Sequence, residues 1–543
     1  MANLLFPNIN LSVADLEKRF PKRRAGQVVT RFAPSPTGFL HIGGVYTAMI
    51  NEKLAHQTED GIFILRIEDT DKKREVPNSK GIICNIFKEL GIQIDEGVIS
   101  EDEQKGNYGS YIQSERVEIY HTVAKQLVLD GYAYPCFCSE EELNAIREYQ
   151  ETNHLNVGYY KEFAKYRNIT VQEAKKLLEE KGSFVLRFKV PSDALERVGF
   201  FDEIKGEIEM ENNYNDFVLL KENGIPTYHF AHACDDHFMG TSTVIRGDEW
   251  LASLPIHKQL FDACGFPFPH YAHVAPIMKL DGESRRKLSK RKDPESNAEF
   301  YLENGYPTEA IYAYLYTLIN SNFEGWYLEN KGTPLKEFDM KLANMSISGA
   351  LYDLAKLNNI AQEVIYSFSV DENVNNLLQW ANKYDADLYQ RLNSDLGFVK
   401  RIFETQGPDS SEHRKDLSCY KEFMDHFGSL YNDVFALGND YYEEMLKENL
   451  PDSLRGEIID KYIEYFRAKE AGSEVTLKDL CKELGYVDRK KYEKNPSMYR
   501  GITTNFYKGL RLCLTHQEHG ISMDDVVHVL GYDEVIRRLE LAR

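Results

Sequence analysis

The sequence feature that most constrains the fold is a strand–loop–helix–strand pattern near the N-terminus. Val28–Phe32 is rich in β-branched residues, which is typical of a strand, and Gly61–Ile67 is a second apolar run of the same kind. Between them lie a loop rich in Pro, Ser and Gly and a helical pattern over about Gly44–His56. Strand, loop, helix and strand in this order predict the first unit of a parallel α/β sheet.

The loop of this unit has the composition of a nucleotide site. It reads Arg31-Phe-Ala-Pro-Ser-Pro-Thr-Gly-Phe-Leu-His-Ile-Gly-Gly. In open α/β sheets, ligands bind where strands end and helix N-termini point outward. Gly38, Gly43 and Gly44 permit a close approach of the backbone to the ligand, and His41 offers a ring nitrogen to phosphate oxygens. A Pro/Gly turn with a surface histidine is the structural alternative, but the whole string favours the nucleotide.

A second string carries several cations. It reads Lys287-Leu-Ser-Lys-Arg-Lys and follows Asp281-Gly-Glu-Ser-Arg-Arg, in which Gly282 permits a turn. A cationic loop suits a triphosphate and its departing pyrophosphate. A solvated basic loop is the alternative, since most charge runs are solvated. Taken with the first string, the loop predicts a clamp around the phosphates of ATP.

The rest of the chain divides into a mixed middle and a helical tail. Helical patterns over 114–151 and 161–181 precede strand patterns over 183–190 and 204–212, so residues 110–225 read as an insertion into the sheet domain. Strand character returns at Phe217–Leu220, Tyr228–Phe230 and Thr243–Arg246. Beyond Lys292 the patterns are helical, with clear examples at 308–319, 421–430, 441–446 and 524–530. We expect one or two helical domains there.

Composition narrows the class of protein. A chain of 543 residues suggests about three to five domains. A net charge of -21 argues against bulk nucleic-acid binding but leaves room for a local basic face. The eight cysteines are scattered, as expected for reduced thiols in the cytoplasm. No apolar stretch is long enough for a membrane helix, and the first 27 residues lack the apolar core of a secretory signal.

The two strings resemble the paired signatures of class I aminoacyl-tRNA synthetases, His-Ile-Gly-His and Lys-Met-Ser-Lys-Ser. Gly44, Leu288 and Arg291 depart from these signatures. The first string resembles the glutamyl-tRNA synthetase branch, whereas glutaminyl enzymes carry Pro-Pro-Glu-Pro-Asn-Gly in the loop. Further blocks agree in order: Leu65–Asp71, Asp216–Leu220, Pro226–Ala231, Asp235–Gly240 and Val244–Trp250. The similarity runs from about Val28 to Leu315 and continues more weakly to the C-terminus.

The resemblance implies a domain organisation. It implies a Rossmann-like parallel-sheet catalytic domain with an inserted acceptor-binding domain, followed by all-α anticodon-binding domains. We expect an N-terminal extension at 1–27, catalytic halves at 28–109 and 226–280, the inserted acceptor-stem-binding domain at 110–225, a stem-contact domain with the lysine loop at 281–340, and helical anticodon-binding parts at 341–455 and 456–543.

The resemblance also implies roles for individual residues. Arg31 and Arg246 match contacts to substrate carboxylates, which a planar guanidinium binds in a bidentate manner, and Glu68 matches the residue that receives the substrate ammonium. The expected substrate-binding residues are Arg31, Ala33, Ser35, Glu68, Tyr228, His232 and Arg246. The expected ATP-binding residues are His41, Gly43, Glu249, Trp250, Lys287 and Lys290, of which His41, Lys287 and Lys290 would be catalytic.

Some of these positions have structural alternatives. For Arg66 and Asp71, a role in an ion-pair network at the strand end is as plausible as a role in substrate binding. For Glu68, substrate binding is the better explanation. His232 stands where the family usually has Asn, and only His can gain charge near neutral pH. A role for His232 in the core or behind the site is therefore at least as plausible as direct contact with the substrate. Trp250 fits simple packing beside the site.

By resemblance, the reaction is the ATP-dependent attachment of L-glutamate to tRNA(Glu). Glutamate and ATP would form glutamyl adenylate, with Mg²⁺ helping to neutralise the phosphates. The acyl group would then move to the 2′-hydroxyl of the terminal adenosine. The branch commonly requires tRNA before activation. The resemblance implies a cytoplasmic monomer with no membrane or DNA partner.

Cys136-Phe-Cys138 is similar to the start of a zinc site in some bacterial members of the family. Tetrahedral zinc needs four ligands. No second cysteine pair follows at the expected distance, and His154 is the single nearby candidate. We therefore favour a metal-free hairpin.

Four other functions stay open at this stage. A glutamyl-queuosine enzyme shares the catalytic half but lacks a long helical tail, and a glutaminyl enzyme is disfavoured by Ala33-Pro-Ser. A non-catalytic RNA-binding relative would be expected to lose His41, Lys287 and Lys290. The sequence does not separate an enzyme for tRNA(Glu) alone from one that also charges tRNA(Gln).

Overall fold

The computed structural model describes residues 1–543 except 72–75, 192–195, 290, 411 and 439–440, and at 321 the backbone alone. The expected first unit is confirmed. Strand β1 (Val29–Phe32) leads into helix α3 (Ile42–His56) and strand β2 (Ile62–Leu65), and the two strands pair in parallel. Strands β3 (Glu96–Val98) and β4 (Gln104–Lys105) complete a sheet in the order β1-β2-β3-β4.

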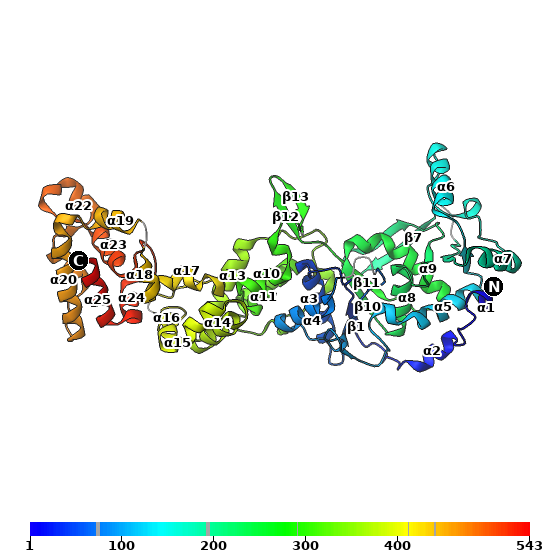
Figure 1. Cartoon of the computed structure of the whole chain (residues 1–543), viewed down its shortest axis with the longest axis horizontal. Coiled ribbons are helices and arrows are strands. Elements are labelled where there is room, and N and C mark those ends of the chain that lie inside the picture. The colour runs from blue at the N-terminus through cyan, green and yellow to red at the C-terminus, as the bar shows by residue number, and fades with distance from the viewer. Residues whose placement is uncertain (72–75, 192–195, 290, 411, 439–440) are drawn as a thin grey trace. The chain divides into compact units, whose positions relative to one another are not determined.

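A second sheet extends this core. Its order is β10-β11-β7-β8, with β10 (Thr243–Gly247), β11 (His270–Val274), β7 (Arg197–Asp202) and β8 (Gly206–Glu211). The first three strands are parallel, while β7 and β8 form an antiparallel hairpin. The amide of Ser242 donates to the carbonyl of Val29 at 3.0 Å, which brings the start of β10 beside β1. Helices α8 (Tyr228–Phe238) and α9 (Leu254–Cys264) lie next to these strands (Figure 1).

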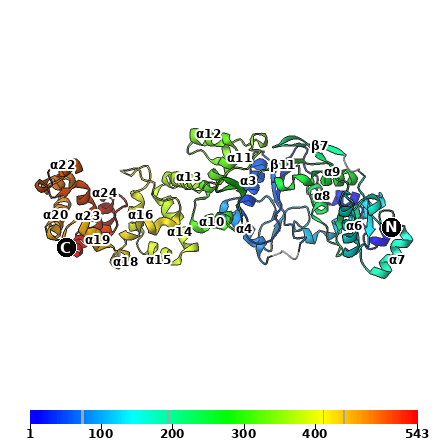
Figure 2. The same cartoon turned by 90° about the horizontal axis from the view of Figure 1, so that it is seen from above.

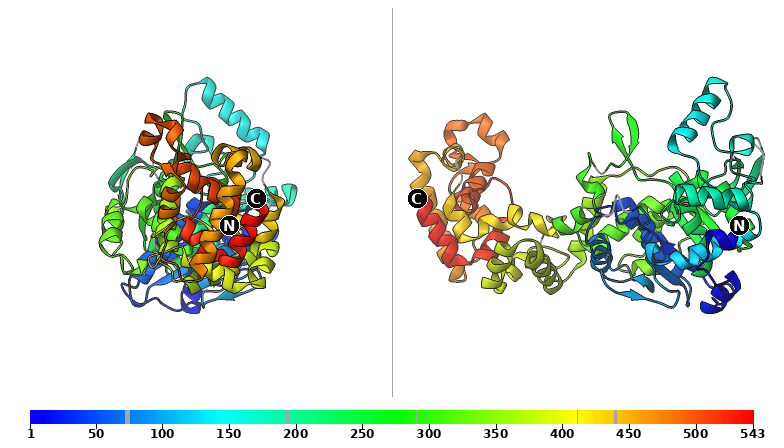
Figure 3. Two further views of the ribbon diagram at one scale, coloured as in Figure 1. Left: turned by 90° about the vertical axis from the view of Figure 1, so that its left-hand side faces the viewer. Right: turned by 45° about the vertical axis from the view of Figure 1, so that its right-hand side comes forward.

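The middle of the chain forms a third, antiparallel sheet in the order β5-β6-β9. It consists of β5 (Ala133–Cys136), β6 (Val185–Phe188) and β9 (Val218–Leu220). Around it stand α5 (Val117–Leu129), α6 (Glu140–Thr152) and α7 (Val171–Lys181). Figure 3 shows α6 projecting away from the sheets. The β7–β8 hairpin, although part of the same stretch of sequence, joins the β10–β11 sheet instead.

Two predictions of secondary structure are wrong in this region. Tyr228–Phe230 is the first turn of helix α8 and not a strand. A short apolar run does not distinguish a strand from a buried helix, and Phe230, Ala233 and Cys234 lie buried at helical spacing. The pattern over 161–181 is helical mainly from Val171, because Thr170 caps α7 by accepting from the amide of Glu173.

The N-terminal segment is held against the sheet region by partly buried polar contacts. It contains helices α1 (Ala2–Leu5) and α2 (Val13–Arg19). The guanidinium of Arg23 donates to both carboxylate oxygens of Glu96, at 2.7 and 2.8 Å, and to the carbonyl of Met239 at 3.0 Å. It also lies 4.0 Å from the ring centre of Tyr108. These contacts tie the segment to β3 and to the end of α8.

The chain divides into two compact units. One comprises residues 1–302 and 312–353, and the other residues 303–311 and 354–543. In the second unit, α20 (Asp452–Glu470), α23 (Thr503–Thr515) and α25 (Tyr532–Ala542) surround a core that includes Ile459, Tyr462 and Phe506. Figure 2 shows α20 and α23 of this unit. The predicted fold class, a Rossmann-like sheet domain followed by helical domains, is confirmed. No helix in the described ranges is both long and apolar enough to cross a membrane.

Candidate active site at the ends of the parallel strands

One cleft of about 680 Å³ in the first unit gathers most of the predicted site residues. It opens where β1, β2 and β10 end, as expected for a ligand site in a parallel sheet. The predicted residues that line it are Arg31, Ala33, Ser35, His41, Gly43, Glu68, Tyr228, Arg246, Glu249, Trp250 and Lys287. Residues far apart in the sequence therefore share one cavity.

Two predicted site residues remain, Lys290 and His232. Lys290 lies outside the described residues. His232 is fully buried behind the cleft, with Nδ1 3.0 Å from a carboxylate oxygen of Asp236 and Nε2 2.8 Å from the hydroxyl of Tyr271. Burial lowers the pKa of His232 to about 3, so the ring is neutral near neutral pH. His232 thus contacts Asp236, which holds Arg31, and its Nδ1 also lies 3.4 Å from Nη2 of Arg31.

His41 and the first turn of α3 form the side of the cleft where phosphate binding is predicted, which we call the phosphate side. Nδ1 of His41 accepts a hydrogen bond of 2.9 Å from the amide of Gly43. A neutral imidazole that accepts at Nδ1 carries its proton at Nε2 and can donate there. Gly43 and Gly44 line the cleft at the helix N-terminus, whose partial positive charge favours phosphate oxygens. A Cβ atom at Gly43 would lie 3.0 Å from Nδ1 of His41, which explains why glycine suits this position.

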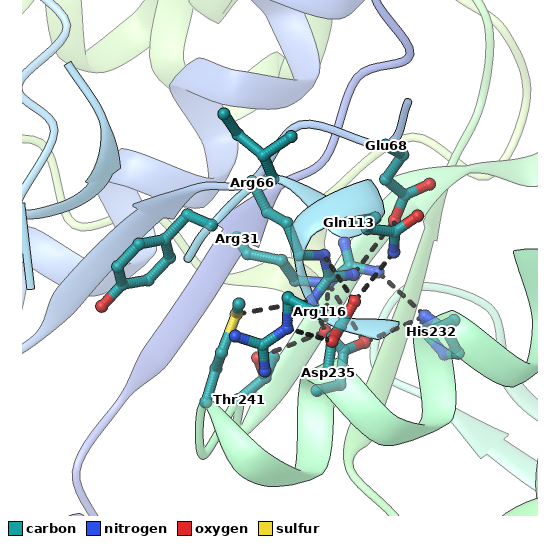
Figure 4. A network of polar contacts seen from close by, with 12 residues as sticks. Arg31, Arg66, Glu68, Gln113, Arg116, His232, Asp235 and Thr241 are labelled. Atoms are coloured by element: carbon teal, nitrogen blue, oxygen red, sulfur yellow. Dashed lines mark hydrogen bonds and ion pairs between the residues drawn. The ribbon is translucent and has the colours of Figure 1, made fainter. Parts of the chain in front are cut away.

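Arg31 is held at the base of the cleft by Asp236, which it shares with Arg66. Nε of Arg31 donates to the two carboxylate oxygens of Asp236 at 3.2 and 3.3 Å, and Nη1 of Arg66 donates to the same carboxylate at 2.6 Å (Figure 4). Burial alone would raise the pKa of Asp236, but the two guanidinium groups hold that pKa well below its usual range. Asp236 is therefore ionised and fixes the orientation of Arg31.

The network continues to Glu68 at the cleft edge. Nη2 of Arg66 donates to Glu68 at 3.1 Å, and Nε of Arg116 donates to Asp235 at 2.7 Å. The predicted ion-pair network around Arg66 is thus present, and Glu68 both belongs to it and lines the cleft. Burial raises the pKa of Glu68, while Arg66 opposes that shift. The network contains three guanidinium groups and three carboxylates, so its charges balance. The groups are those of Arg31, Arg66 and Arg116 and of Glu68, Asp235 and Asp236.

Arg246 has a different environment. Its guanidinium donates to the hydroxyl of Tyr228 at 3.3 Å, to the carbonyl of Trp250 at 3.1 Å and to Nε2 of His273 at 3.0 Å. Within the described part of the chain it forms no ion pair with a carboxylate, although it is only 5% exposed. A buried cation with neutral partners attracts an anion from solution. Arg246 is therefore suited to bind a carboxylate of a ligand.

The lysine loop begins at Lys287, the last residue of a hairpin that ion pairs stabilise. Strands β12 (Met278–Asp281) and β13 (Ser284–Lys287) pair in antiparallel fashion, with Gly282 in the turn at a φ of +64°. Arg286 donates to Asp293 at 2.6 Å and to Asp281 at 2.8 Å. The amine of Lys287 lies 3.5 Å from Glu249 and is more than half exposed. Exposed ion pairs of this kind are weak, so a phosphate can replace Glu249 as the partner of Lys287.

Several residues of the site were not predicted from the sequence. Further cleft-lining side chains include Thr37, Tyr46, Thr47, Ile277 and Leu288. Behind Arg246 lie His257, His273 and Asp202. Their roles depend on which strands are neighbours in the sheet, and no local motif indicates that pairing. Trp250 both packs against Tyr228, with ring centres 4.3 Å apart, and lines the cleft.

Cys136 and Cys138 share one neighbour. Each sulfur lies 3.4 Å from the hydroxyl of Tyr159. No group of three or more His, Cys, Asp or Glu side chains suited to a metal is found in the part of the chain that the structure describes. The metal-free hairpin stays a prediction.

Two family models match the chain. The catalytic-domain model of class I tRNA synthetases of the E and Q type, where the letters stand for glutamate and glutamine, matches residues 27–347. The chain belongs to this synthetase family. An anticodon binding domain model matches residues 376–543 of the synthetase.

Relatives resemble the synthetase over its full length. It is 42% identical over 552 residues to the glutamate–tRNA ligase of Clostridium perfringens strain 13, with 99% of each chain covered. It is 40% identical over 546 residues to the glutamate–tRNA ligase of Acetivibrio thermocellus, with 99% of this chain and 98% of the relative covered. A crystal structure of a glutamate tRNA ligase from Elizabethkingia meningosepticum in complex with its amino acid matches with a TM-score of 0.73 and 28% identity, covering 95% of this chain and 99% of that one. The predicted resemblance to the glutamyl branch is confirmed.

Proposed function

We propose that the synthetase attaches L-glutamate to tRNA(Glu) in an ATP-dependent reaction through glutamyl adenylate. The observation that carries this proposal is that the buried Arg246 and the helix N-terminus at His41 line the same cleft. An acid and a nucleotide can therefore bind side by side, which is the main requirement for adenylate formation. The relatives named as glutamate–tRNA ligases support glutamate as the acid.

Glutamate carries two carboxylates and one ammonium group, and the cleft offers groups of the opposite charge. Arg31 and Arg246 would each bind one carboxylate, while Glu68 would receive the ammonium. Tyr228 donates or accepts through its hydroxyl beside Arg246, and Ala33 and Ser35 shape the pocket. His232 supports the pocket from behind through Asp236.

The phosphate side would hold ATP. The phosphates would be bound by Nε2 of His41, the amide groups at Gly43 and the amine of Lys287. Lys290 is assigned the same role by its place in the motif. Glu249 and Trp250 would contact the nucleotide. The α-carboxylate of glutamate attacks the α-phosphorus, the bond to the β-phosphate oxygen breaks, and pyrophosphate leaves. The 2′-hydroxyl of the terminal adenosine of tRNA then attacks the acyl carbon and releases AMP. Positioning and electrostatic stabilisation suffice for both steps.

We propose that Mg²⁺ accompanies ATP. The described residues show no group of three or more protein ligands, so the ion would take most of its ligands from phosphate oxygens and water. Its contribution is to neutralise phosphate charge. We infer that the helical unit, in which residues 376–543 match the anticodon binding domain model, holds the anticodon region, and that the enzyme works as a monomer in the cytoplasm.

The exchange of labelled pyrophosphate into ATP tests this function. Glutamate should support exchange when tRNA(Glu) is present and not in its absence. A lack of exchange under both conditions would contradict adenylate formation. Exchange that favours glutamine would contradict the glutamate assignment. Charging of purified tRNA(Glu) and tRNA(Gln) in parallel then decides whether the enzyme acts on one tRNA or on both.

A further inference from the structure

Three parallel strands bring together three buried polar residues that lie far apart in the sequence. Arg246 on β10 is the register partner of His273 on β11, and Asp202, the last residue of β7, is the partner of Tyr271 on β11. His273 and Asp202 are completely buried. None of the sequence motifs of the site includes either residue, so their role must be read from the contacts.

Hydrogen bonds fix the protonation state of His273. Nε of Arg246 donates to Nε2 of His273 at 3.0 Å. A guanidinium is always a donor, so Nε2 of His273 must be the acceptor and the ring proton must be on Nδ1. Nδ1 lies 2.7 Å from a carboxylate oxygen of Asp202, to which it donates. The carboxylate thus selects the one neutral tautomer that can accept from Arg246.

The carboxylate of Asp202 is itself held rigidly by the backbone. One oxygen accepts from the amides of Ile204 at 3.0 Å and Lys205 at 2.9 Å, and the other accepts from the amide of His273 at 3.1 Å. Burial would raise the pKa of Asp202, but these hydrogen bonds and the one from the His273 ring keep it below its usual value. Asp202 is therefore an ionised and immobile acceptor.

We propose that Asp202 and His273 are positioning residues that hold the guanidinium of Arg246 in the orientation that receives a carboxylate of glutamate. This inference rests on the proposed role of Arg246 in glutamate binding. Neither residue lines the cleft, so both act through Arg246. Besides His273, the guanidinium of Arg246 contacts the hydroxyl of Tyr228, the carbonyl of Trp250 and Nδ1 of His257. Loss of the relay, by which we mean the hydrogen bonds from Asp202 through His273 to Arg246, would therefore let the guanidinium turn without leaving its pocket.

Replacing Asp202 by asparagine gives the sharpest test. The amide oxygen of the asparagine would accept from the amides of Ile204 and Lys205, as one oxygen of Asp202 does now. Its NH₂ group would then face Nδ1 of His273. His273 would then have to accept at Nδ1 and carry its proton on Nε2, where it would meet the N–H of Arg246. The same exchange in serine proteases traps the catalytic imidazole in the wrong tautomer. We expect Asp202→Asn to raise the KM for glutamate on the order of 10- to 100-fold in tRNA charging, with the KM for ATP changed less than about twofold.

Two further variants separate the hydrogen bond from the ring. His273→Phe keeps an aromatic side chain but removes the acceptor for Arg246, so it should raise the KM for glutamate as much as Asp202→Asn. His273→Gln offers an amide oxygen to Arg246 and should recover part of the loss. In the double variant Asp202→Asn/His273→Phe, the Asp202 change should add less than about a further twofold, because the relay is already broken. If Asp202→Asn does not fold, the two His273 variants carry the test alone.

The same pair of strands supplies a matched control. Glu203, the residue after β7, accepts a hydrogen bond of 2.8 Å from Nδ1 of His270 on β11, and the His270 side chain is largely exposed. Neither residue is among the described partners of Arg246. Glu203→Gln should leave the KM for glutamate unchanged. The proposal would be wrong if the Asp202→Asn and His273→Phe proteins fold and have the same KM for glutamate as Glu203→Gln. An Arg246→Lys protein with an unchanged KM would instead show that Arg246 does not bind glutamate, and the proposed site would fail with it.

Discussion

The imidazole of His41 and the amide of Gly43 are joined by a hydrogen bond of 2.9 Å in the first turn of α3. Gly43→Ala would place a Cβ atom 3.0 Å from Nδ1 and push the ring away from this position. We expect kcat for glutamate activation to fall on the order of 10- to 100-fold, since a displaced histidine no longer donates to the phosphates. Pyrophosphate exchange measures this. Gly325→Ala in α12 (Ser321–Glu329), where a Cβ atom meets nothing within 4 Å, should leave the rate unchanged, and an equal loss in both variants would refute the role of His41.

The exposed amine of Lys287 should matter for ATP and little for stability. Lys287→Ala removes a positive charge from the phosphate side of the cleft, so kcat/KM for ATP should fall on the order of 10²- to 10³-fold. The unfolding midpoint should stay the same, because the ion pair with Glu249 is exposed. Lys331→Ala, also at an exposed position of this unit, serves as the control. Unchanged ATP kinetics in Lys287→Ala would contradict the assignment.

Asp236 is the shared carboxylate of two buried arginines, so its loss should cost stability. Asp236→Asn leaves Arg31 and Arg66 with less negative charge in a dry environment. We expect the free energy of unfolding to fall by about 3–5 kcal/mol, measured by urea denaturation. Asp262→Asn removes an exposed partner of Lys258 and should change it by less than about 1 kcal/mol. Similar effects of the two variants would mean that the network does not stabilise the fold.

Two neighbouring arginines test how the N-terminal segment is anchored. Arg23 makes a bidentate, mostly buried pair with Glu96, whereas Arg24 pairs with Asp60 near the surface. Arg23→Ala should lower the free energy of unfolding by about 1.5–3 kcal/mol, because the mostly buried carboxylate of Glu96 would lose its charged partner and keep the hydroxyl of Tyr111 as a donor. Arg24→Ala should cost less than about 1 kcal/mol. Chemical denaturation of both variants gives the comparison, and equal losses would argue against the anchoring role of Arg23.

Buried neutral histidines should make stability depend on pH. Burial lowers the pKa of His232 to about 3 and that of His229 to about 4, against about 6.5 in the unfolded chain. Above pH 6.5 these histidines are neutral in both the folded and the unfolded chain, so they do not reduce the free energy of unfolding. Below it the unfolded chain binds protons that the folded chain does not, so each histidine costs up to about 1.4 kcal/mol per pH unit.

Urea denaturation between pH 7 and pH 5 measures this effect above the usual pKa of carboxylates. His232→Asn, which removes the titratable ring and keeps a polar side chain, should show a shallower decrease in the free energy of unfolding. A slope equal to that of the unchanged protein would show that His232 does not contribute.

The parts of the site that the sequence predicts are those in which chemistry and position lie in one short segment. Arg31, His41 and Gly43 belong to one strand–loop–helix string, so their meeting in the cleft followed from a local pattern. Asp236 lay in a recognised block, but its contact with Arg31 spans 205 residues. Asp202 and His273 have no motif, because their contact depends on β7 joining β11. The strand predicted at Tyr228–Phe230 failed for a related reason: three apolar residues do not reveal the helix they begin.

The place of β7 in the sheet has a consequence for engineering. Residues 110–225 were predicted to form the inserted acceptor-stem-binding domain, yet Asp202 lies within this range and binds His273 behind Arg246. A chimera made at those boundaries would exchange a residue that supports the proposed amino-acid pocket along with the proposed tRNA-binding domain. Grafts that retain the β7–β8 hairpin, residues 197–211, would keep the two specificities separate.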